Sequence, residues 1–275
     1  IDAVKNCGYS CSYCSIQTMF KEPEISFDQE FAQKVSSLTF DPNKTYHIGT
    51  GQSSDALLWG NRNRQLEILC DLARKNKNII LEFKTKSANI DWLISNQPPK
   101  NVICSWSLNV QEVIKNEEHL TASLEMRIEA ARKIADTKNL VAFHFHPIFE
   151  IENWQHEYGK LFELVQKNFT SEEIAFISFG TLTFPKPVLN KIRQYPYMTK
   201  ILQMPFEPNP EGKLTYPIAI KRSLFSFAYQ SFANWHNQVF FYLCMEPAEI
   251  WDSVFGRCYR DNHEFEQDLS RGVFK

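Results

Sequence analysis

Three cysteines near the start of the chain have the spacing of an iron–sulfur site. Cys7, Cys11 and Cys14 follow a C-x3-C-x2-C pattern within the run NCGYSCSYCSIQTMF. Three thiolates can ligate three irons of a [4Fe–4S] cluster, which leaves the fourth iron open to bind and reduce a small molecule. The spacing therefore predicts a [4Fe–4S] cluster that takes part directly in a reaction.

Zinc and disulfide bonds are the alternative uses of these cysteines. A zinc site needs a fourth soft ligand, and no second pair of cysteines or histidines follows at zinc-finger spacing. Disulfides need an oxidising compartment and usually an even cysteine framework, whereas this chain has seven cysteines. We expect Cys70, Cys104 and Cys244 to lie in the core and Cys258 to be exposed.

The composition indicates an enzyme domain with an extension. Of 275 residues, 43% are hydrophobic and 14% aromatic, which is enough for a large core and argues against disorder. The net charge of −2 provides no general attraction to nucleic acid. No apolar run is long enough to span a bilayer, and clustered thiolates persist best in a reducing interior, so we expect a soluble, cytoplasmic protein without membrane contact. The chain begins at Ile1 rather than Met, so we expect a preceding segment to be missing or processed.

Short β-branched or aromatic runs alternate with amphipathic helical patterns along most of the chain. The expected strands are a short one just before Cys7, then Lys44–Thr50, Asn78–Phe83, Val102–Leu108, Leu140–Pro147 and Ile174–Gly180. The expected helices are Phe27–Ser37, Asn63–Lys75, Leu124–Thr137 and Trp154–Asn168. Six such units are too few for a closed eight-unit barrel, so the pattern predicts an α/β fold with a partial (β/α)6 TIM-type barrel.

We place this barrel in residues 1–185. Residues 186–275 contain Pro-rich turns, a helical pattern at Ile218–Trp235 and the strand-like run VFFYLCM, and are expected to form an α+β extension that packs on the barrel. In a barrel of this type, active residues gather at the C-terminal ends of the strands.

Several segments resemble a known family. CSYCSIQT is similar to the cluster loop of spore photoproduct lyase, a DNA repair photolyase-type family of the radical S-adenosylmethionine superfamily, in which an aromatic residue such as Tyr13 precedes the third cysteine. Further matching segments occur in the same order: TGQSSD (Thr50–Asp55), FKTKS (Phe83–Ser87), SWSLN (Ser105–Asn109), RIEAARKIA (Arg127–Ala135) and HPIFEIENW (His146–Trp154). The resemblance covers most of Cys7–Gly180.

The resemblance implies a radical enzyme with two cofactors. Cys7, Cys11 and Cys14 would ligate the [4Fe–4S] cluster. Ser54, Lys86 and Ser107 match positions that contact S-adenosylmethionine, and Asp55 would support them. Reductive cleavage would then give a 5′-deoxyadenosyl radical that abstracts hydrogen from a nucleic-acid or nucleotide-like substrate, with the electron coming from a donor such as flavodoxin or ferredoxin.

Two positions depart from the family pattern. Gln52 stands where the lyase has a cysteine that returns a hydrogen atom, and Ser15 stands where it has the second tyrosine of a YCY pair, so only Tyr13 remains. Another donor such as Tyr13 or Cys104, a reaction that needs no such return, or a different substrate could explain the change, and we favour the last. An iron–sulfur protein that binds S-adenosylmethionine for a sensory role is the alternative function.

Two further groups of residues could act on the substrate. His144 and His146 alternate in FHFHPIF, so both rings project to one face of a strand, where they could bind substrate or transfer protons, or simply be satisfied in a polar interior. Lys186, Lys191, Arg193 and Lys200 alternate with Pro and Tyr, a composition compatible with phosphate contact but also with a solvated face.

Overall fold

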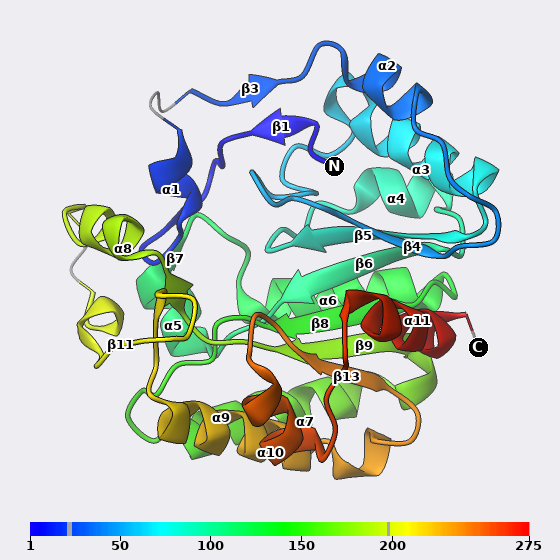
Figure 1. The fold of residues 1–275 in the computed structure, drawn as a ribbon. Helices are drawn as coiled ribbons and strands as arrows, with labels where there is room; N and C mark the ends of the chain where they lie inside the picture. Colours follow the sequence, from blue (N-terminus) through cyan, green and yellow to red (C-terminus); the bar gives the residue numbers. More distant parts are fainter. Residues whose placement is uncertain (21–23, 197–198, 275) are drawn as a thin grey trace.

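A curved sheet of six parallel strands forms the centre of the molecule (Figure 1). The computed structural model describes residues 1–20, 24–196 and 199–274. The spatial order of the strands is β4 (Tyr46–Thr50), β5 (Ile79–Thr85), β6 (Val102–Ser107), β8 (Val141–Phe145), β9 (Ile174–Phe179) and β13 (Phe240–Leu243). Each strand pairs in parallel with the next along the sequence, so the sheet is an open half-barrel, as predicted.

Helices connect these strands, as right-handed parallel connections require. They are α2 (Phe31–Ser36), α3 (Gln65–Lys75), α4 (Asp91–Asn96), α5 (Gln111–Glu117), α6 (Leu124–Asp136), α7 (Trp154–Asn168), α8 (Lys186–Ile192) and α9 (Ile218–Ser231), followed by α10 (Ala248–Phe255) and α11 (Asn262–Val273). Short 3-10 turns are η1 (Arg62–Arg64), η2 (Ser171–Glu173), η3 (Ile201–Gln203) and η4 (Ala233–Trp235). In the part of the chain that is described, no helix is long and apolar enough to cross a bilayer.

The inner face of the half-barrel is built in layers, because every second residue of a strand points to the same side. The lowest layer is apolar: Ile80, Ile103, Ala142, Phe176 and Phe240 pack against Leu269 and Val273 of α11. The next layer is polar and buried, with Glu82, Ser105, His144 and Ser178. Above it, at the C-terminal ends of the strands, lie Lys84, Ser107 and His146. The helix α11 thus closes the bottom of the half-barrel and leaves the top for a site.

The N-terminal segment lies across the top of the sheet rather than inside it. β1 (Val4–Lys5) pairs antiparallel with β3 (Ser26–Phe27), and β2 (Ser10–Cys11) pairs antiparallel with β7 (Glu118–His119). A short helix, α1 (Ile16–Met19), follows the cysteines and packs beside α8. The expectation that the strand before Cys7 belongs to the barrel is therefore wrong.

The sixth strand of the sheet comes from the C-terminal segment instead. β13 is the predicted run VFFYLCM, and it pairs with β9 from Phe240 to Leu243. Three short strands that precede it in the chain form a small separate sheet: β10 (Thr183–Phe184), β11 (Glu207–Pro208) and β12 (Leu214–Thr215). A domain boundary at residue 185 stays a prediction, but β13 lies beyond it and still completes the barrel, because an edge strand can join after a long connection.

Candidate active site

The three cysteines predicted to hold a cluster line one cavity at the top of the half-barrel. This cysteine cavity has a volume of about 120 Å³. Its lining residues come from the N-terminal loop and from the ends of three strands: Cys7, Tyr9, Cys11, Cys14, Ile16, Gly51, Ser54, Asp55, Lys84, Thr85, Lys86 and Ser107. All the residues that we matched to S-adenosylmethionine contacts are therefore in the same cavity as the cysteines.

The segment after α5 holds the cysteine loop in place. Ser12 donates its backbone N–H to the carbonyl of Glu117 at 2.8 Å and its hydroxyl to the Glu117 carboxylate. The phenol of Tyr13 donates to the Glu118 carboxylate, and the N–H of Cys14 closes a turn onto the carbonyl of Cys11 at 3.1 Å. These bonds fix the segment from Cys11 to Cys14 against the end of α5.

The thiols lie in surroundings that favour a metal partner. Burial raises the pKa of Cys7 to about 11 and also raises those of Cys11 and Cys14, so the free thiolates are disfavoured. Bound iron reverses this balance, because the cation stabilises each thiolate it binds. Among residues 1–20, 24–196 and 199–274, no three Cys, His, Asp or Glu side chains could hold a single metal ion. Three ligands of a cubane cluster each bind a different iron and need only surround a cavity, so the cysteines fit a cluster better than one ion.

Ser54 offers a free hydroxyl to a ligand in this cavity. It is 6% exposed, and its Oγ is buried without a hydrogen-bond partner. A buried hydroxyl that lacks a partner is costly, so it indicates a group that a ligand satisfies. The loop that carries it leaves β4 at Gly51, whose φ is positive at 85°. A Cβ at this position would lie 3.0 Å from the carbonyl oxygen of Lys84 and 3.0 Å from the backbone nitrogen of Ala56, so only glycine fits.

Two carboxylates, the half-buried Asp2 and the buried Asp55, hold that loop and its neighbour. Asp2 accepts the N–H groups of Gly51, Gln52 and Ser53 at 2.7–3.1 Å. Asp55 accepts the hydroxyl of Thr85 at 2.7 Å and the N–H of Lys86 at 2.6 Å. Asp55 thus joins the end of β4 to the end of β5 and positions the strand end that carries Lys86.

Lys86 belongs to a buried charge cluster beside the cysteines. Its Nζ lies 3.8 Å from the carboxylate of Glu118 and 5.5 Å from the centre of the Tyr13 ring. Arg127 pairs with the same carboxylate at 2.7 Å and donates to the carbonyl of Ser107 at 2.8 Å. Burial alone would raise the pKa of Glu118, but Lys86 and Arg127 hold it below its usual range, so the carboxylate is charged.

The two histidines lie in the half-barrel with ring centres 5.2 Å apart. His144 is engaged on both sides, by Glu82 through Nε2 and by Ser178 through Nδ1, each at 2.5 Å. Burial and the charge of Lys84 lower its pKa to about 4, so the ring is neutral at pH 7. His146 contacts Ser178 through Nε2 at 3.0 Å and sits one layer higher.

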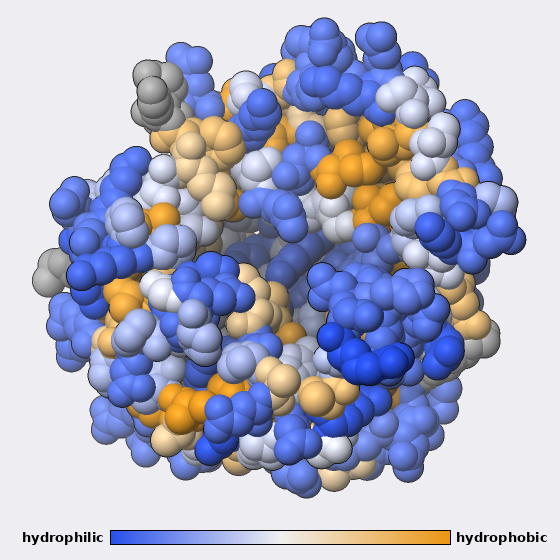
Figure 2. All heavy atoms as spheres, in the orientation of Figure 1, coloured by the Kyte–Doolittle hydropathy of each residue, from blue (hydrophilic) through white to orange (hydrophobic). Residues whose placement is uncertain are grey.

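A second cavity adjoins the first at Cys14 and Lys84, and His146 lines it. This histidine cavity measures about 280 Å³ and is otherwise lined by Tyr13, Ser15, Pro147, Gly180, Thr181, Leu182, Thr183, Phe184, Cys244 and Met245. In the orientation of Figure 1, Figure 2 shows a hollow near the middle of the molecule with hydrophilic residues in its depth. The two cavities thus lie side by side at the top of the half-barrel and share Cys14 and Lys84.

Comparison with known proteins gives the family. The family model of spore photoproduct lyase matches residues 2–209. The chain belongs to the spore photoproduct lyase family.

Curated relatives and solved structures agree with this family. The chain is 29% identical over 179 residues to spore photoproduct lyase of Clostridium acetobutylicum, covering 63% of this chain and 53% of that protein. It is 24% identical over 208 residues to the enzyme of a Geobacillus species, covering 73% and 61%. The chain thus spans between half and two thirds of the length of these relatives. A mutant spore photoproduct lyase solved with bound S-adenosylmethionine and dinucleoside spore photoproduct matches with a TM-score of 0.75 and 21% identity over 88% of this chain and 75% of that one.

The two departures from the family pattern lie in different places. Gln52 is exposed and does not line either cavity, whereas Ser15 lines the histidine cavity. Cys104 is fully buried and outside both cavities, so it is remote from a substrate placed there. The phenol of Tyr13 is already bonded to Glu118, although its ring lines the histidine cavity.

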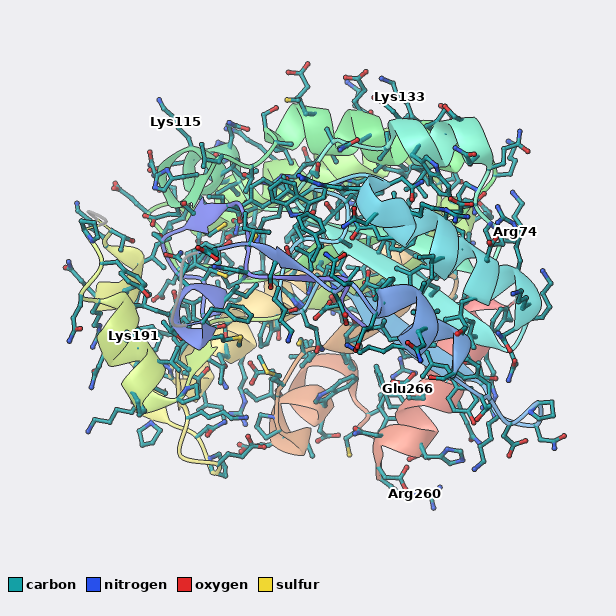
Figure 3. The ribbon with its side chains drawn as sticks, turned by 90° about the horizontal axis from the view of Figure 1, so that it is seen from above. Arg74, Lys115, Lys133, Lys191, Arg260 and Glu266 are labelled. Carbon is teal, nitrogen blue, oxygen red and sulfur yellow. The ribbon has the colours of Figure 1, made fainter. Side chains whose placement is uncertain are left out.

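The four basic residues predicted for phosphate contact are not equally available. The guanidinium of Arg193 donates to the carbonyl of Leu202 at 2.6 and 3.0 Å and lies over the Phe206 ring. Lys191, at the α8 side of the molecule in Figure 3, reaches the carbonyl of Thr18 beside the cysteine loop at 3.3 Å. Lys186 and Lys200 are exposed, so the role of this group in substrate binding stays a prediction.

Sequence reasoning missed three residues of the site. Lys84, two positions before Lys86, lines both cavities, and the alternation in FKTKS could have shown that the two ammonium groups share a face. Glu118 and Asp2 had no signal, because their partners lie more than forty residues away in the chain.

Proposed function

We propose that this protein is a radical S-adenosylmethionine enzyme that acts on a nucleic-acid or nucleotide-like substrate. The observation that carries this proposal is the cysteine cavity, where three cysteines meet the unpartnered hydroxyl of Ser54 and the ammonium of Lys86. Membership of the spore photoproduct lyase family supports the same chemistry.

The residues of the cavity divide between the two cofactors. Cys7, Cys11 and Cys14 would hold a [4Fe–4S] cluster. Together the reduced cluster and S-adenosylmethionine supply a 5′-deoxyadenosyl radical that abstracts hydrogen from a substrate.

The remaining side chains would bind and orient the nucleoside cofactor. Ser54 and Ser107 suit its hydroxyl and carboxylate oxygens, and Lys86 brings positive charge. Glu118 and Asp55 keep Lys86 in position, one through charge and the other through the backbone N–H.

The histidine cavity is the proposed place of the substrate. A related lyase binds dinucleoside spore photoproduct, which supports a substrate with nucleobases here too. His146 would face such a substrate, while His144 supports His146 through Ser178. Tyr13 would contact the substrate through its ring. The electron would come from an acidic carrier such as flavodoxin or ferredoxin.

The decisive experiment is product formation by the reconstituted protein. Iron, sulfide, dithionite and S-adenosylmethionine are added without oxygen, and 5′-deoxyadenosine is quantified with and without dinucleoside spore photoproduct. Cys11→Ala should abolish both cluster uptake and product. Cys70→Ala is the matched control, because this thiol is buried in α3 and outside the cavity. Equal iron content in the two variants would contradict the ligand assignment.

A binding or sensory role is the second candidate. It is favoured by Gln52, an amide that is a poor hydrogen donor and lies outside both cavities. A reducible cluster that binds S-adenosylmethionine but gives no 5′-deoxyadenosine with any added nucleotide would select this role over catalysis.

A further inference from the structure

Lys84 carries a partly buried ammonium group at the junction of the two cavities. Both cavities are lined by this side chain, and the lysine lies on the inner face between Glu82 and Lys86. In the described ranges 1–20, 24–196 and 199–274, its Nζ takes part in no hydrogen bond or ion pair. A cation that is partly removed from water and has no partner in the protein is poorly compensated, and it is free to bind an anion that enters either cavity.

The nearest carboxylate on the same strand is already occupied. Glu82 accepts the hydroxyl of Ser105 and one imidazole nitrogen from His144, both at 2.5 Å, and a second imidazole from His47 at 2.9 Å. Burial opposes protonation of His47, but Glu82 outweighs this effect and raises its pKa. The Glu82 carboxylate thus has three hydrogen-bond partners of its own, and none of them is Lys84.

The other acids around the lysine already have partners. Asp55, which lines the cysteine cavity with Lys84, accepts the N–H groups of Leu57, Leu58 and Lys86 and the hydroxyl of Thr85. The groups that act on Lys84 besides Glu82 are Cys244 of the β13 end and the like charge of Lys86. Glu246, just beyond Cys244, is paired with the buried ammonium of Lys221 at 2.6 Å. Among the described residues that line the histidine cavity there is no Asp or Glu.

The neighbours of Lys84 are hydrogen-bonding groups that suit an anion. Ser15, Thr181, Thr183 and His146 line the histidine cavity with it. Hydroxyl and imidazole N–H groups donate to carboxylate or phosphate oxygens, and a lysine ammonium binds such oxygens as a point charge. The hydroxyl of Thr181 donates to Glu246 at 3.4 Å and that of Thr183 to Thr215 at 3.1 Å, so a bound oxyanion would compete for these two donors. The unpaired cation of Lys84 is therefore the main feature of the cavity that favours an anion.

We propose that Lys84 binds an oxyanion, a carboxylate or a phosphate, of a molecule that occupies these cavities. This inference rests on the proposed function for the identity of that molecule. The oxyanion is either the carboxylate of S-adenosylmethionine bound in the cysteine cavity or a phosphate of the substrate bound in the histidine cavity.

Stability of the unliganded protein gives the first test. Lys84→Met removes a partly buried charge that has no partner, so its urea midpoint should equal or exceed that of the unchanged protein. Lys221→Met is the matched control, because it removes a buried lysine that has a partner and leaves Glu246 unpaired. The control should be clearly less stable. A loss in Lys84→Met as large as that in Lys221→Met would overturn the proposal.

Ligand binding gives the second test and separates the two sources. Affinity for S-adenosylmethionine is measured by anaerobic calorimetry on the reconstituted protein, and affinities for thymidine 5′-monophosphate and thymidine are measured on the same preparation. A loss of about tenfold in S-adenosylmethionine affinity in Lys84→Met, restored in Lys84→Arg, assigns the anion to the cofactor. A preference of about tenfold for the monophosphate over thymidine that Lys84→Met abolishes assigns it to the substrate.

Unchanged S-adenosylmethionine affinity together with an unchanged ratio of monophosphate to thymidine overturns the proposal. The nucleotide measurement needs no turnover, so it also decides the matter if no 5′-deoxyadenosine forms. Conversely, product formation in Lys84→Met with unaltered affinities would leave the proposed function standing and remove only the anion site.

Discussion

The buried ion pair between Arg127 and Glu118 offers a quantitative test of how the site is held together. Both side chains are at most 1% exposed, and their charged atoms are 2.7 Å apart. Arg127 also donates to the carbonyls of Ala122 and Ser107 and to the hydroxyl of Thr121 at 2.6–2.9 Å. We therefore predict a large loss of stability when Arg127 is replaced by methionine.

The magnitude follows from what is left behind. Arg127→Met removes the nearest cation from the Glu118 carboxylate, which keeps Lys86 at 3.8 Å and the Tyr13 hydroxyl, and removing one partner of a buried pair costs roughly 3–5 kcal/mol. For a protein of this size that corresponds to a drop of roughly 6–20 °C in the unfolding midpoint. The exposed pair of Arg222 and Glu249 is the control, with side chains 42% and 65% exposed. Arg222→Met should cost roughly 0–1 kcal/mol.

The double variant Arg127→Met/Glu118→Gln decides whether the stranded charge is the cause. Neutralising Glu118 should restore part of the stability that the single variant loses. The assay is urea unfolding followed by circular dichroism at pH 7. If the double variant is no more stable than Arg127→Met, the lost hydrogen bonds rather than the unpaired carboxylate account for the effect, and the reasoning about this charge cluster fails.

Four further outcomes follow from single residues. The pKa of His144 is lowered to about 4, so the unfolded chain binds the extra proton before the folded chain does. The free energy of unfolding should therefore fall by about 3 kcal/mol as the pH drops from 6.5 to 4, and urea titrations of His144→Gln should lack most of this loss. His47, whose pKa is raised, contributes with the opposite sign and loses its contribution as the pH rises above 6.5. Ser54→Ala removes a hydroxyl that has no partner, so the urea midpoint should stay unchanged while calorimetry shows S-adenosylmethionine binding weakened roughly three- to tenfold; loss of stability instead would point to an internal partner. Gly180→Ala adds a Cβ 3.1 Å from the His146 ring, so nucleotide binding in the histidine cavity should weaken while iron content is retained. Unchanged binding would show that the His146 ring can move away without cost.

Much of the fold could be predicted because the signals are local. The helix α7 was expected at Trp154–Asn168 and lies there, and α6 differs from its expected range by one residue at its end. Period-two patterns in the strands and period-3.6 patterns in the helices arise from burial of one face, and this requires no knowledge of the partner. The strand before Cys7 was assigned wrongly, because two residues with strand character pair equally well inside a barrel or, as here, with β3 outside it.

The sequence by itself determined the candidate cluster ligands, the six-strand half-barrel and the segments that carry the site, since each depends on residue types at fixed spacing. Only the tertiary structure decided which groups meet. It brought β13 to the edge of the sheet and placed Glu118 against Tyr13, more than one hundred residues away in the chain. It also placed the Glu82 carboxylate within hydrogen-bonding distance of His47 and left Lys84 without a partner. Hydrogen bonding and charge balance depend on distances of a few ångströms between remote segments, and no local pattern in the chain encodes those distances.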